Sequence, residues 1–339
     1  MTGKTGMTGK MGKIALEEHF AFPDTLEDSA VFVPASHWPE LKHRITDIHG
    51  DRLREMDKAG IEMTLLSLNA PAVQAIIDTK HAIDAARRSN DYLAKEVAKN
   101  PKRFQGLAAL AMQDPDEATR EIERAVMQLG FRGALVNGFS QAEDPNTPIY
   151  LDDARYDGFW AKVAELGVPF YLHPRNPLPQ DARIYDGHPW LMGPTWAFAQ
   201  ETAVHALRLM SSGLFDRHPD LQIVLGHMGE NLPFAIWRCD NRNKWLNQPP
   251  KYPAKRLLSE HFQDNFYITV SGNFSTPALL CSMQVIGAGR ILFSTDWPFE
   301  AIDEAALWFD ACPISEADRM RIGRTNSLEL FRLQDVLGG

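Results

Sequence analysis

Two carboxylates and an imidazole end a short apolar run near the start of the chain, in Ile14-Ala15-Leu16-Glu17-Glu18-His19-Phe20. In a buried strand the side chains alternate between two faces, so Glu17 and His19 would share one face and Glu18 the other. An oxygen and a nitrogen ligand on one face could begin a site for a divalent metal ion. The alternative is a strand end that simply meets water. We expect Glu18, on the opposite face, to be structural.

Three later apolar runs also end in residue types that bind metals, namely His173, His227 and Asp296. In a barrel of parallel strands the C-terminal strand ends meet at one mouth, so these side chains would converge with Glu17 and His19. Each has a simpler reading as well. His173 could be a loop histidine, His227 a helix cap or an acid–base residue, and Asp296 a helix N-cap. Four strand ends of this kind together favour a metal-centred site over four separate caps.

The elements that must position these residues alternate regularly along the chain. Buried parallel strands read as continuous apolar runs, and a helical pattern follows each one. The expected strands are 14–20, 63–68, 104–112, 133–136, 168–172, 221–225, 266–270 and 290–293. Eight such units predict a (β/α)8 TIM barrel, with long insertions after the first and fifth strands. No GxGxxG motif follows the first strand, which weakens the alternative of a doubly wound dinucleotide-binding sheet.

The composition is that of an ordinary globular protein. The chain has 339 residues, 44% hydrophobic and 23% charged, with a net charge of −9. Without a basic block, neither nucleic acid nor an anionic membrane is an expected partner. Three scattered cysteines fit no CxxC metal spacing and favour a reducing compartment, so we expect a cytoplasmic location. Residues 1–12 read as a flexible tail and 13–339 as a single domain.

Other residues are candidates for the barrel mouth. Glu230 lies three positions after His227, so on one helical turn it could orient that imidazole. Arg238, further along the same expected helix, could meet an anionic substrate or a neighbouring subunit. Either Phe32 or Phe299 could wall a pocket or belong to the core. Further candidates in the second insertion and at strand ends are His188, Trp190, Asn69, Asn137 and Asn273.

The motifs ALEEHF, LHPRNP, LGHMGE and FSTDWPFE resemble the amidohydrolase superfamily, and within it the metal-dependent decarboxylases that include aminocarboxymuconate-semialdehyde decarboxylase. The resemblance covers the chain from about Lys13 to its end. It implies that one divalent ion, Mn²⁺ or Zn²⁺, is bound, and that the protein is a homotetramer without an organic cofactor. The implied metal ligands are Glu17, His19, His173 and Asp296, the acid–base pair is His227 and Glu230, and the implied substrate-binding residues are Phe32, Arg238, Phe299 and His188.

One departure from the wider superfamily bears on the number of metals. Hydrolytic members often carry His-X-His on the first strand and a carboxylated lysine at the fourth. This sequence has Glu17 and His19 on the first strand and Asn137 at the end of the fourth. No lysine is available there to bridge a second ion, so a site with one metal is expected.

The implied reaction is non-oxidative, reversible decarboxylation of a dihydroxybenzoate, with 2,6-dihydroxybenzoate giving resorcinol and CO₂. Direct loss of CO₂ would leave an aryl carbanion in the ring plane, which the π system cannot stabilise. Protonation of the ring carbon first avoids that species, and Asp296 is the candidate donor, with His227 and Glu230 assisting. The alternatives are another isomer such as 2,3-dihydroxybenzoate, a metal-dependent lactone hydrolase on the same barrel, and a catalytically silent barrel.

Overall fold

The computed structural model describes residues 12–142, 144–245 and 252–338. In these ranges eight parallel strands lie in the order β1-β2-β3 and β4-β7-β8-β9-β10, and a bridge from Ala108 to Ala134 joins the two groups. Their bounds are Lys13–Phe20 (β1), Ile61–Leu68 (β2), Phe104–Gly106 (β3), Ala134–Asn137 (β4), Phe170–His173 (β7), Ile223–Leu225 (β8), Phe266–Thr269 (β9) and Ile291–Leu292 (β10). The arrangement is the TIM barrel that the sequence predicts.

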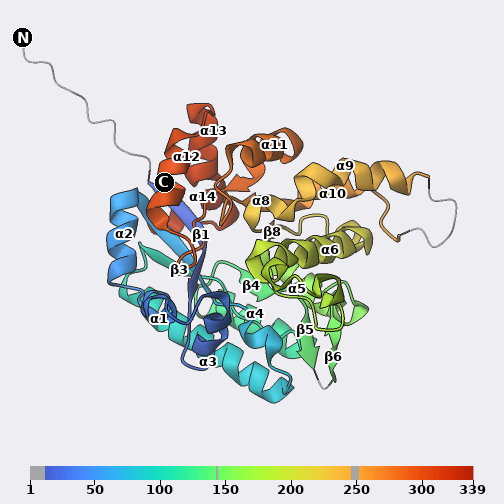
Figure 1. Cartoon of the computed structure of the whole chain (residues 1–339), viewed down its shortest axis with the longest axis horizontal. Helices are drawn as coiled ribbons and strands as arrows, with labels where there is room; N and C mark the ends of the chain where they lie inside the picture. Colours follow the sequence, from blue (N-terminus) through green and yellow to red (C-terminus); the bar gives the residue numbers. More distant parts are fainter. Residues whose placement is uncertain (1–11, 143, 246–251, 339) are drawn as a thin grey trace, which may run out of the picture.

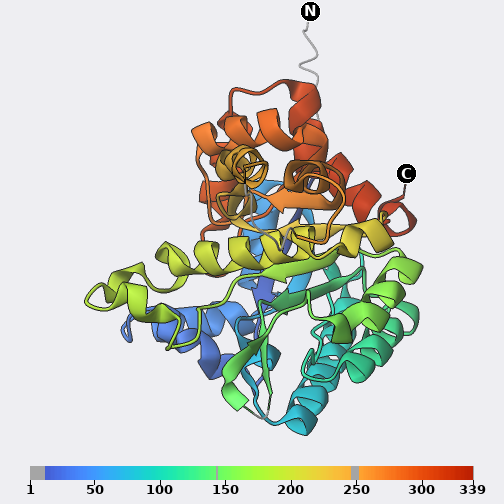
Figure 2. The same ribbon diagram turned by 90° about the vertical axis from the view of Figure 1, so that its right-hand side faces the viewer.

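Helices surround the strands (Figures 1 and 2). Figure 2 shows the C-terminal helices, coloured orange to red, gathered on one side of the barrel. The α-helices are Trp38–Thr46 (α1), Asp51–Ala59 (α2), Thr79–Lys99 (α3), Pro115–Met127 (α4), Asp157–Leu166 (α5), Ala197–Ser211 (α6), Leu214–Arg217 (α7), His227–Glu230 (α8), Leu232–Asn243 (α9), Leu258–Asn265 (α10), Thr276–Ile286 (α11), Ile302–Ala311 (α12), Glu316–Met320 (α13), Asn326–Leu330 (α14) and Gln334–Leu337 (α15). No helix in the described ranges is long and apolar enough to cross a membrane.

Two layers of apolar side chains hold the barrel together. Alternate strand residues, such as Ile14 and Leu16 of β1, form one buried cluster inside it. Phe331 and Leu333, near the chain end, belong to that cluster and so anchor the C-terminal segment to the barrel. The other strand face, with Ala15 for example, packs in a larger cluster with the surrounding helices. Because each strand is covered on both faces, it reads in the sequence as one continuous apolar run.

The two long insertions fold mostly into short helical turns. The first contains a 3₁₀ helix, η1 (Leu26–Phe32), followed by α1. The second contains three more: η4 (Ala182–Tyr185), η5 (Pro189–Leu191) and η6 (Gly193–Thr195). Their Pro and Gly content suits such turns rather than long helices.

Three elements differ from expectation. The third strand ends at Gly106, whereas the prediction ran to Met112. Residues 107–112 are buried but pair with a neighbouring strand only through the isolated bridge from Ala108 to Ala134, and an apolar run reports burial, not pairing. An antiparallel hairpin, β5 (Ser140–Ala142) and β6 (Asp144–Ile149), and the helix α10 were not predicted, since both are polar and short. The predicted tail, residues 1–12, lies outside the described residues except for Gly12.

Candidate metal centre and active site

Glu17 and His19 both reach the barrel mouth from β1, as expected, but the strand between them is irregular. Glu17 has a φ of +63°, and the pairing of β1 with β2 shifts register between Ala15 and Glu18. Such a bulge places an extra residue in one strand and redirects its side chain. Glu17 and His19 therefore both reach the mouth, as strand alternation predicted, but the backbone between them is a bulge and not a regular strand.

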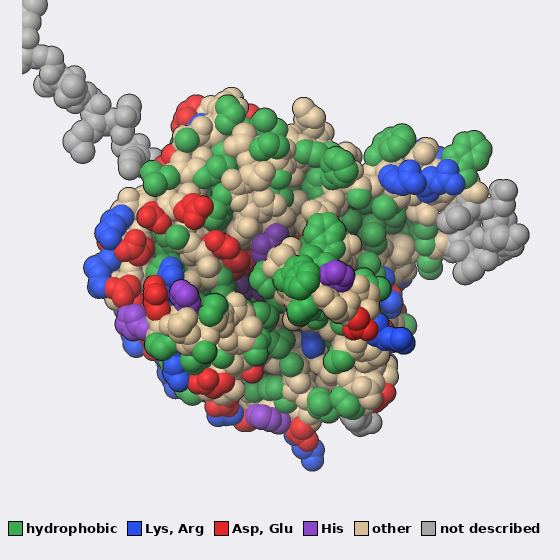
Figure 3. Space-filling model, in the orientation of Figure 1, with side chains coloured by type: hydrophobic (Ala, Val, Ile, Leu, Met, Phe, Trp, Pro, Cys, Tyr) green, Lys and Arg blue, Asp and Glu red, His purple; other side chains and the backbone are tan. Residues whose placement is uncertain are grey.

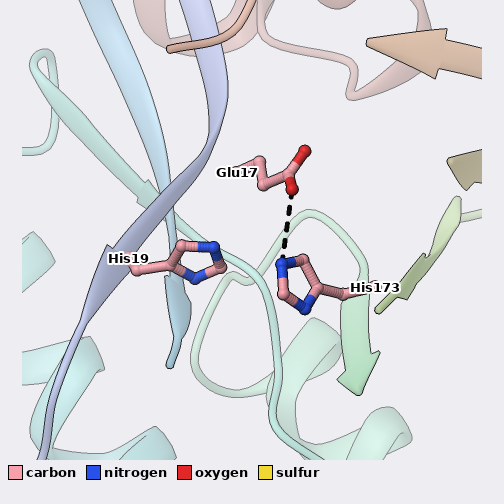
Figure 4. Close-up of side chains that lie close together, drawn as sticks. All are labelled: Glu17, His19 and His173. Atoms are coloured by element: carbon pink, nitrogen blue, oxygen red, sulfur yellow. Dashed lines mark ion pairs between the residues drawn. The ribbon is translucent and has the colours of Figure 1, made fainter. Parts of the chain in front are cut away.

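The predicted ligands and His227 converge at one place, although the chain brings them from the ends of four strands. Glu17 Oε1 lies 3.3 Å from His173 Nε2, and the two side chains face each other with His19 beside them (Figure 4). His19 Nε2 lies 3.4 Å from Asp296 Oδ1. His227 Nε2 lies 3.3 Å from Glu17 Oε1 and 3.8 Å from Asp296 Oδ2. Ligand atoms of Glu17, His19 and His173 lie within 4.8 Å of one another, as do those of Glu17, His227 and Asp296.

The surroundings of Glu17 suit a carboxylate that binds a cation through one oxygen. Its Oε2 accepts hydrogen bonds from the hydroxyls of Tyr171, Thr269 and Ser271. Its Oε1 is fully buried and has no hydrogen-bond partner among the described residues. A buried carboxylate oxygen without a donor is costly unless a cation or a proton satisfies it. The free oxygen, beside two histidine nitrogens, therefore fits a divalent ion, and mixed O and N donors suit both Mn²⁺ and Zn²⁺.

The imidazole ring of His19 is oriented by a hydrogen-bond partner on the side away from the cluster. Its Nδ1 lies 3.3 Å from the hydroxyl of Ser67 on β2, which leaves Nε2 facing Asp296. A partner on the second ring nitrogen fixes the ring of a metal-binding histidine. Phe299 packs edge-on against the same ring, with centroids 5.8 Å apart.

His227 and Glu230 are paired, but not on a right-handed helical turn. His227 Nδ1 lies 2.7 Å from Glu230 Oε1, as the spacing predicted. The segment labelled α8 is not a right-handed helix, because residues 227–231 all have φ values between +50° and +74°, and α9 begins only at Leu232. The expectation that one helix runs on from His227 is therefore wrong. Glycine at position 229 relieves one of these left-handed positions, and the others are non-glycine residues in a conformation that L-residues rarely adopt.

Burial and charge shift the protonation of the cluster in different directions. Burial by itself would raise the pKa of Glu17, but the three imidazoles around it hold that pKa well below its usual range. Burial by itself would lower the pKa of His227, but the surrounding carboxylates, that of Glu230 foremost, hold it well above its usual value. Burial lowers the pKa of His173, which favours the neutral, metal-binding form. Burial raises the pKa of Glu18 to about 7.

A cavity of about 230 Å³ opens over the cluster. Its lining combines the imidazoles and Asp296 with apolar side chains. The lining residues are His19, Phe32, Val33, Ala70, His173, Pro194, Phe198, His227, Asp296, Phe299 and Glu300. In Figure 3 histidine (purple) is visible in a hollow near the middle of the face, with hydrophobic side chains (green) at its rim.

A second cavity of about 250 Å³ adjoins the first, because His227, Asp296 and Glu300 line both. It is more polar and also has Glu230, Asn231 and Asn273 in its wall. His227 and Asp296 therefore stand between an apolar compartment and a polar one.

The predicted pocket residues divide into two groups. Phe32 and Phe299 line the cavity, with ring centroids 6.3 Å apart. Arg238 is exposed on α9 and lines a separate groove between α6 and α9. His188 is exposed beside Trp190 and does not line either cavity. A role for Arg238 or His188 in substrate binding stays a prediction, because neither residue lines the two cavities of the single chain.

Asn69 and Asn137 are turn and core residues rather than cavity walls. Both are buried, and the Asn137 side-chain amide donates to the carbonyl of Asn69. Sequence reasoning missed Tyr171, Thr269, Ser271 and Phe198. Tyr171 lies two residues before His173 on β7, so strand alternation could have placed both on the barrel interior. Thr269 and Ser271 show the same two-residue spacing at the end of β9, and Phe198 carries no local signal.

Comparison with known proteins agrees with this geometry. The family model described as Amidohydrolase matches residues 19–333. The chain belongs to the amidohydrolase family. It is 65% identical over 322 residues to gamma-resorcylate decarboxylase of Rhizobium sp. (strain MTP-10005), which covers 95% of this chain and 98% of the relative. Its group within the family is that of the gamma-resorcylate decarboxylases.

Two solved structures of this group match closely. A 2,6-dihydroxybenzoate decarboxylase complexed with 2,6-dihydroxybenzoate has a TM-score of 0.94 at 64% identity, over 95% of this chain and 100% of the other. A dihydroxybenzoic acid decarboxylase from Polaromonas sp. JS666, with bound manganese and the inhibitor 2-nitroresorcinol, has a TM-score of 0.94 at 62% identity, over 97% and 99% of the two chains. The predicted family and barrel are confirmed.

Proposed function

We propose that this protein is a metal-dependent carboxy-lyase that converts 2,6-dihydroxybenzoate to resorcinol and CO₂ reversibly and without oxidation. The observation that carries the proposal is the cluster of Glu17, His19, His173 and Asp296, the first three buried, beneath a cavity with partly apolar walls. The relatives described above bear the same activity in their names, and one of them contains manganese. One divalent ion per chain, Mn²⁺ before Zn²⁺, is the cofactor that these residues would hold.

The cavity suits a small aromatic carboxylate. Phe32 and Phe299 stand nearly perpendicular to each other, at 88°, and present apolar surface to a flat ring. The polar part of the lining would receive the carboxylate and an ortho oxygen. A divalent ion held by the cluster supplies positive charge that stabilises those oxygens.

The residues of the chain supply the proton. Asp296 would donate it to the ring carbon that carries the carboxylate, and that carbon becomes tetrahedral. The bond to the carboxylate carbon then breaks, its electron pair restores the aromatic ring, and CO₂ leaves. His227 Nε2, 3.8 Å from Asp296 Oδ2, is close enough to return a proton to that carboxylate after a small movement. Glu230 stabilises the charged form of His227.

Turnover of the substrate tests the function directly. Protein loaded with Mn²⁺ and incubated with 2,6-dihydroxybenzoate is expected to release resorcinol and CO₂ in equal amounts, in the absence of O₂ and of any organic cofactor. Chelation of the metal should abolish turnover, and added Mn²⁺ should restore it. High bicarbonate should drive carboxylation of resorcinol, since the same residues serve both directions. No release of resorcinol from metal-replete protein would reject the proposal.

Two alternatives share the site. Preference for 2,3-dihydroxybenzoate over the 2,6-isomer in the same assay would change the substrate but keep the reaction class. Hydrolysis of a lactone, without decarboxylation of any dihydroxybenzoate, would instead indicate a metal-dependent hydrolase. The apolar cavity walls and the relatives favour the decarboxylase.

We also propose that the protein forms a homotetramer, with α9 and the second insertion as contact regions. Large apolar side chains on these segments are exposed in the single chain, with exposed fractions of 89% for Phe234, 73% for Trp237 and 64% for Trp190. Exposed apolar side chains that gather on one region commonly mark a protein interface. Light scattering after size-exclusion chromatography measures the mass, and a monomer would contradict this proposal.

A further inference from the structure

Glu18 is the residue between two candidate metal ligands, yet its side chain turns away from them. It is fully buried, and its carboxylate holds Thr295, at the far end of the sequence. Glu18 Oε1 accepts hydrogen bonds from the backbone N–H of Thr295 at 2.8 Å and from its hydroxyl at 2.9 Å. The hydroxyl also lies 2.7 Å from Glu18 Oε2. One side chain therefore holds both the main chain and the side chain of Thr295.

Thr295 directly precedes Asp296, whose position the strand ladder does not secure. The strand β10 spans only Ile291–Leu292, so its regular pairing ends well before Asp296. Asp296 has a φ of +74°, in the left-handed region that non-glycine residues rarely adopt. A residue keeps such a backbone conformation only when contacts with the surrounding structure hold it there. The contact of Glu18 with Thr295 holds the residue directly before that position.

The contact also lies where the barrel has to close. β1 and β10 are the end strands of the two hydrogen-bonded groups. Across this seam, the backbone N–H of His19 donates to the carbonyl of Trp297 at 2.7 Å. Together with the bonds from Thr295 to Glu18, this places links between β1 and the segment after β10 on both sides of Asp296. Each movement of that segment relative to β1 would change the distance from Asp296 to His19, now 3.4 Å.

We propose that Glu18 is a positioning residue, which holds Thr295 so that the Asp296 carboxylate stays between His19 and His227. The proposal rests on the proposed function in assigning Asp296 as proton donor and metal ligand. Glu18 itself touches neither the cavity nor the metal cluster. Partners behind a ligand typically change metal affinity or activity 10–100-fold when removed.

The variants T295V and E18M remove this contact to different degrees. T295V has nearly the same shape but lacks the hydroxyl, and it keeps the backbone bond to Glu18. E18M removes both acceptor oxygens at similar volume. T295S keeps the hydroxyl and is the conservative variant. T64V is the matched control. Thr64, on β2, is also fully buried, and among the described residues its hydroxyl has one hydrogen-bond partner, the sulfur of Met56 at 3.9 Å.

The measurements are kcat and KM for 2,6-dihydroxybenzoate, Mn²⁺ affinity by isothermal titration calorimetry, and the thermal midpoint. We expect T295V to lower kcat about 10-fold and E18M about 100-fold, with KM changed less, and both to weaken Mn²⁺ binding. T295S should recover most of the loss of T295V, and T64V should match the wild type in kcat and Mn²⁺ affinity.

A purely structural role gives a different result. If T295V lowered the thermal midpoint while kcat per folded protein and Mn²⁺ affinity stayed at wild-type values, the proposal would be overturned. An equal loss in T64V would overturn it as well. If E18M does not fold, T295V decides alone. If the wild type does not turn over 2,6-dihydroxybenzoate, the proposed function fails, and the Mn²⁺ affinities of T295V and T64V still decide the positioning role.

Discussion

His227 and Glu230 form a hydrogen bond of 2.7 Å through a turn of left-handed residues, not through a helix. The turn points the imidazole toward Glu17 and Asp296 while Glu230 stays buried behind it. A right-handed helix starting at His227 would also bring residues three apart together. The pairing alone therefore does not explain the left-handed backbone of 227–231. The pair is therefore built into the loop after β8, before α9 begins.

Replacement of Glu230 by glutamine tests the pair. E230Q removes the charge that holds the proton on His227 and keeps nearly the same shape. We expect kcat to fall about 10- to 100-fold, with Mn²⁺ content unchanged, because Glu230 does not belong to the metal cluster. Elemental analysis and steady-state kinetics measure the two quantities. The exposed Glu316 gives a control in E316Q, and an unchanged kcat in E230Q would exclude an acid–base role for the pair.

Asp296 is expected to be essential for proton transfer. D296N keeps an oxygen that can face His19 but cannot donate a carboxyl proton. Turnover should fall at least about 100-fold, the lower range for removal of a general acid, while the protein folds and binds metal measurably. Circular dichroism and metal analysis check the fold and the loading. Near-normal turnover by D296N would remove Asp296 as the proton donor.

Phe32 is expected to contribute to substrate binding rather than to the chemical step. Its ring lies 5.6 Å from that of Phe198 and 6.3 Å from that of Phe299, at the cavity wall. In F32A the lost apolar contact should raise KM about 10-fold with a smaller change in kcat. The control is F22A, since Phe22 is half-buried against Tyr92 and does not line the cavity. A fall in kcat at constant KM would place Phe32 in the chemical step instead.

His205 should make the fold sensitive to acid. It is buried, its Nε2 accepts a hydrogen bond from the backbone N–H of Leu151 at 3.0 Å, and burial lowers its pKa from 6.5 to about 3. Below pH 6.5 the unfolded chain therefore binds a proton at His205 that the folded chain does not. Stability from this residue is full above pH 6.5 and is lost as the pH falls toward 3, by up to about 1.4 kcal/mol per pH unit.

The variant H205Q isolates this contribution, since the side-chain oxygen of glutamine can accept the same hydrogen bond. Thermal midpoints at pH 7.5 and pH 5 should differ less for H205Q than for the wild type. H43Q, at an exposed histidine, should behave like the wild type. An equal loss of stability in the wild type and H205Q would show that the pKa of His205 does not differ between the folded and unfolded chains in this pH range.

The sequence alone was enough to predict the barrel and to place the candidate ligands at its mouth. Buried strands and amphipathic helices are local patterns, so their alternation could be read without the fold. The rule that parallel strands end at one mouth grouped Glu17, His19, His173, His227 and Asp296, and the structure brings these side chains together. The spacing of three residues was sufficient to pair His227 with Glu230.

Only the tertiary structure decided how these side chains are held. The bulge at Glu17 and the left-handed turn at 227–231 depend on neighbours that pack against them, and no local pattern reports a φ angle of this kind at a non-glycine residue. The hydroxyl of Tyr171 on Glu17, and the hold of Glu18 on Thr295, join residues 154 and 277 positions apart. Such contacts exist only once the barrel has closed, because closure is what brings the first and last strands side by side.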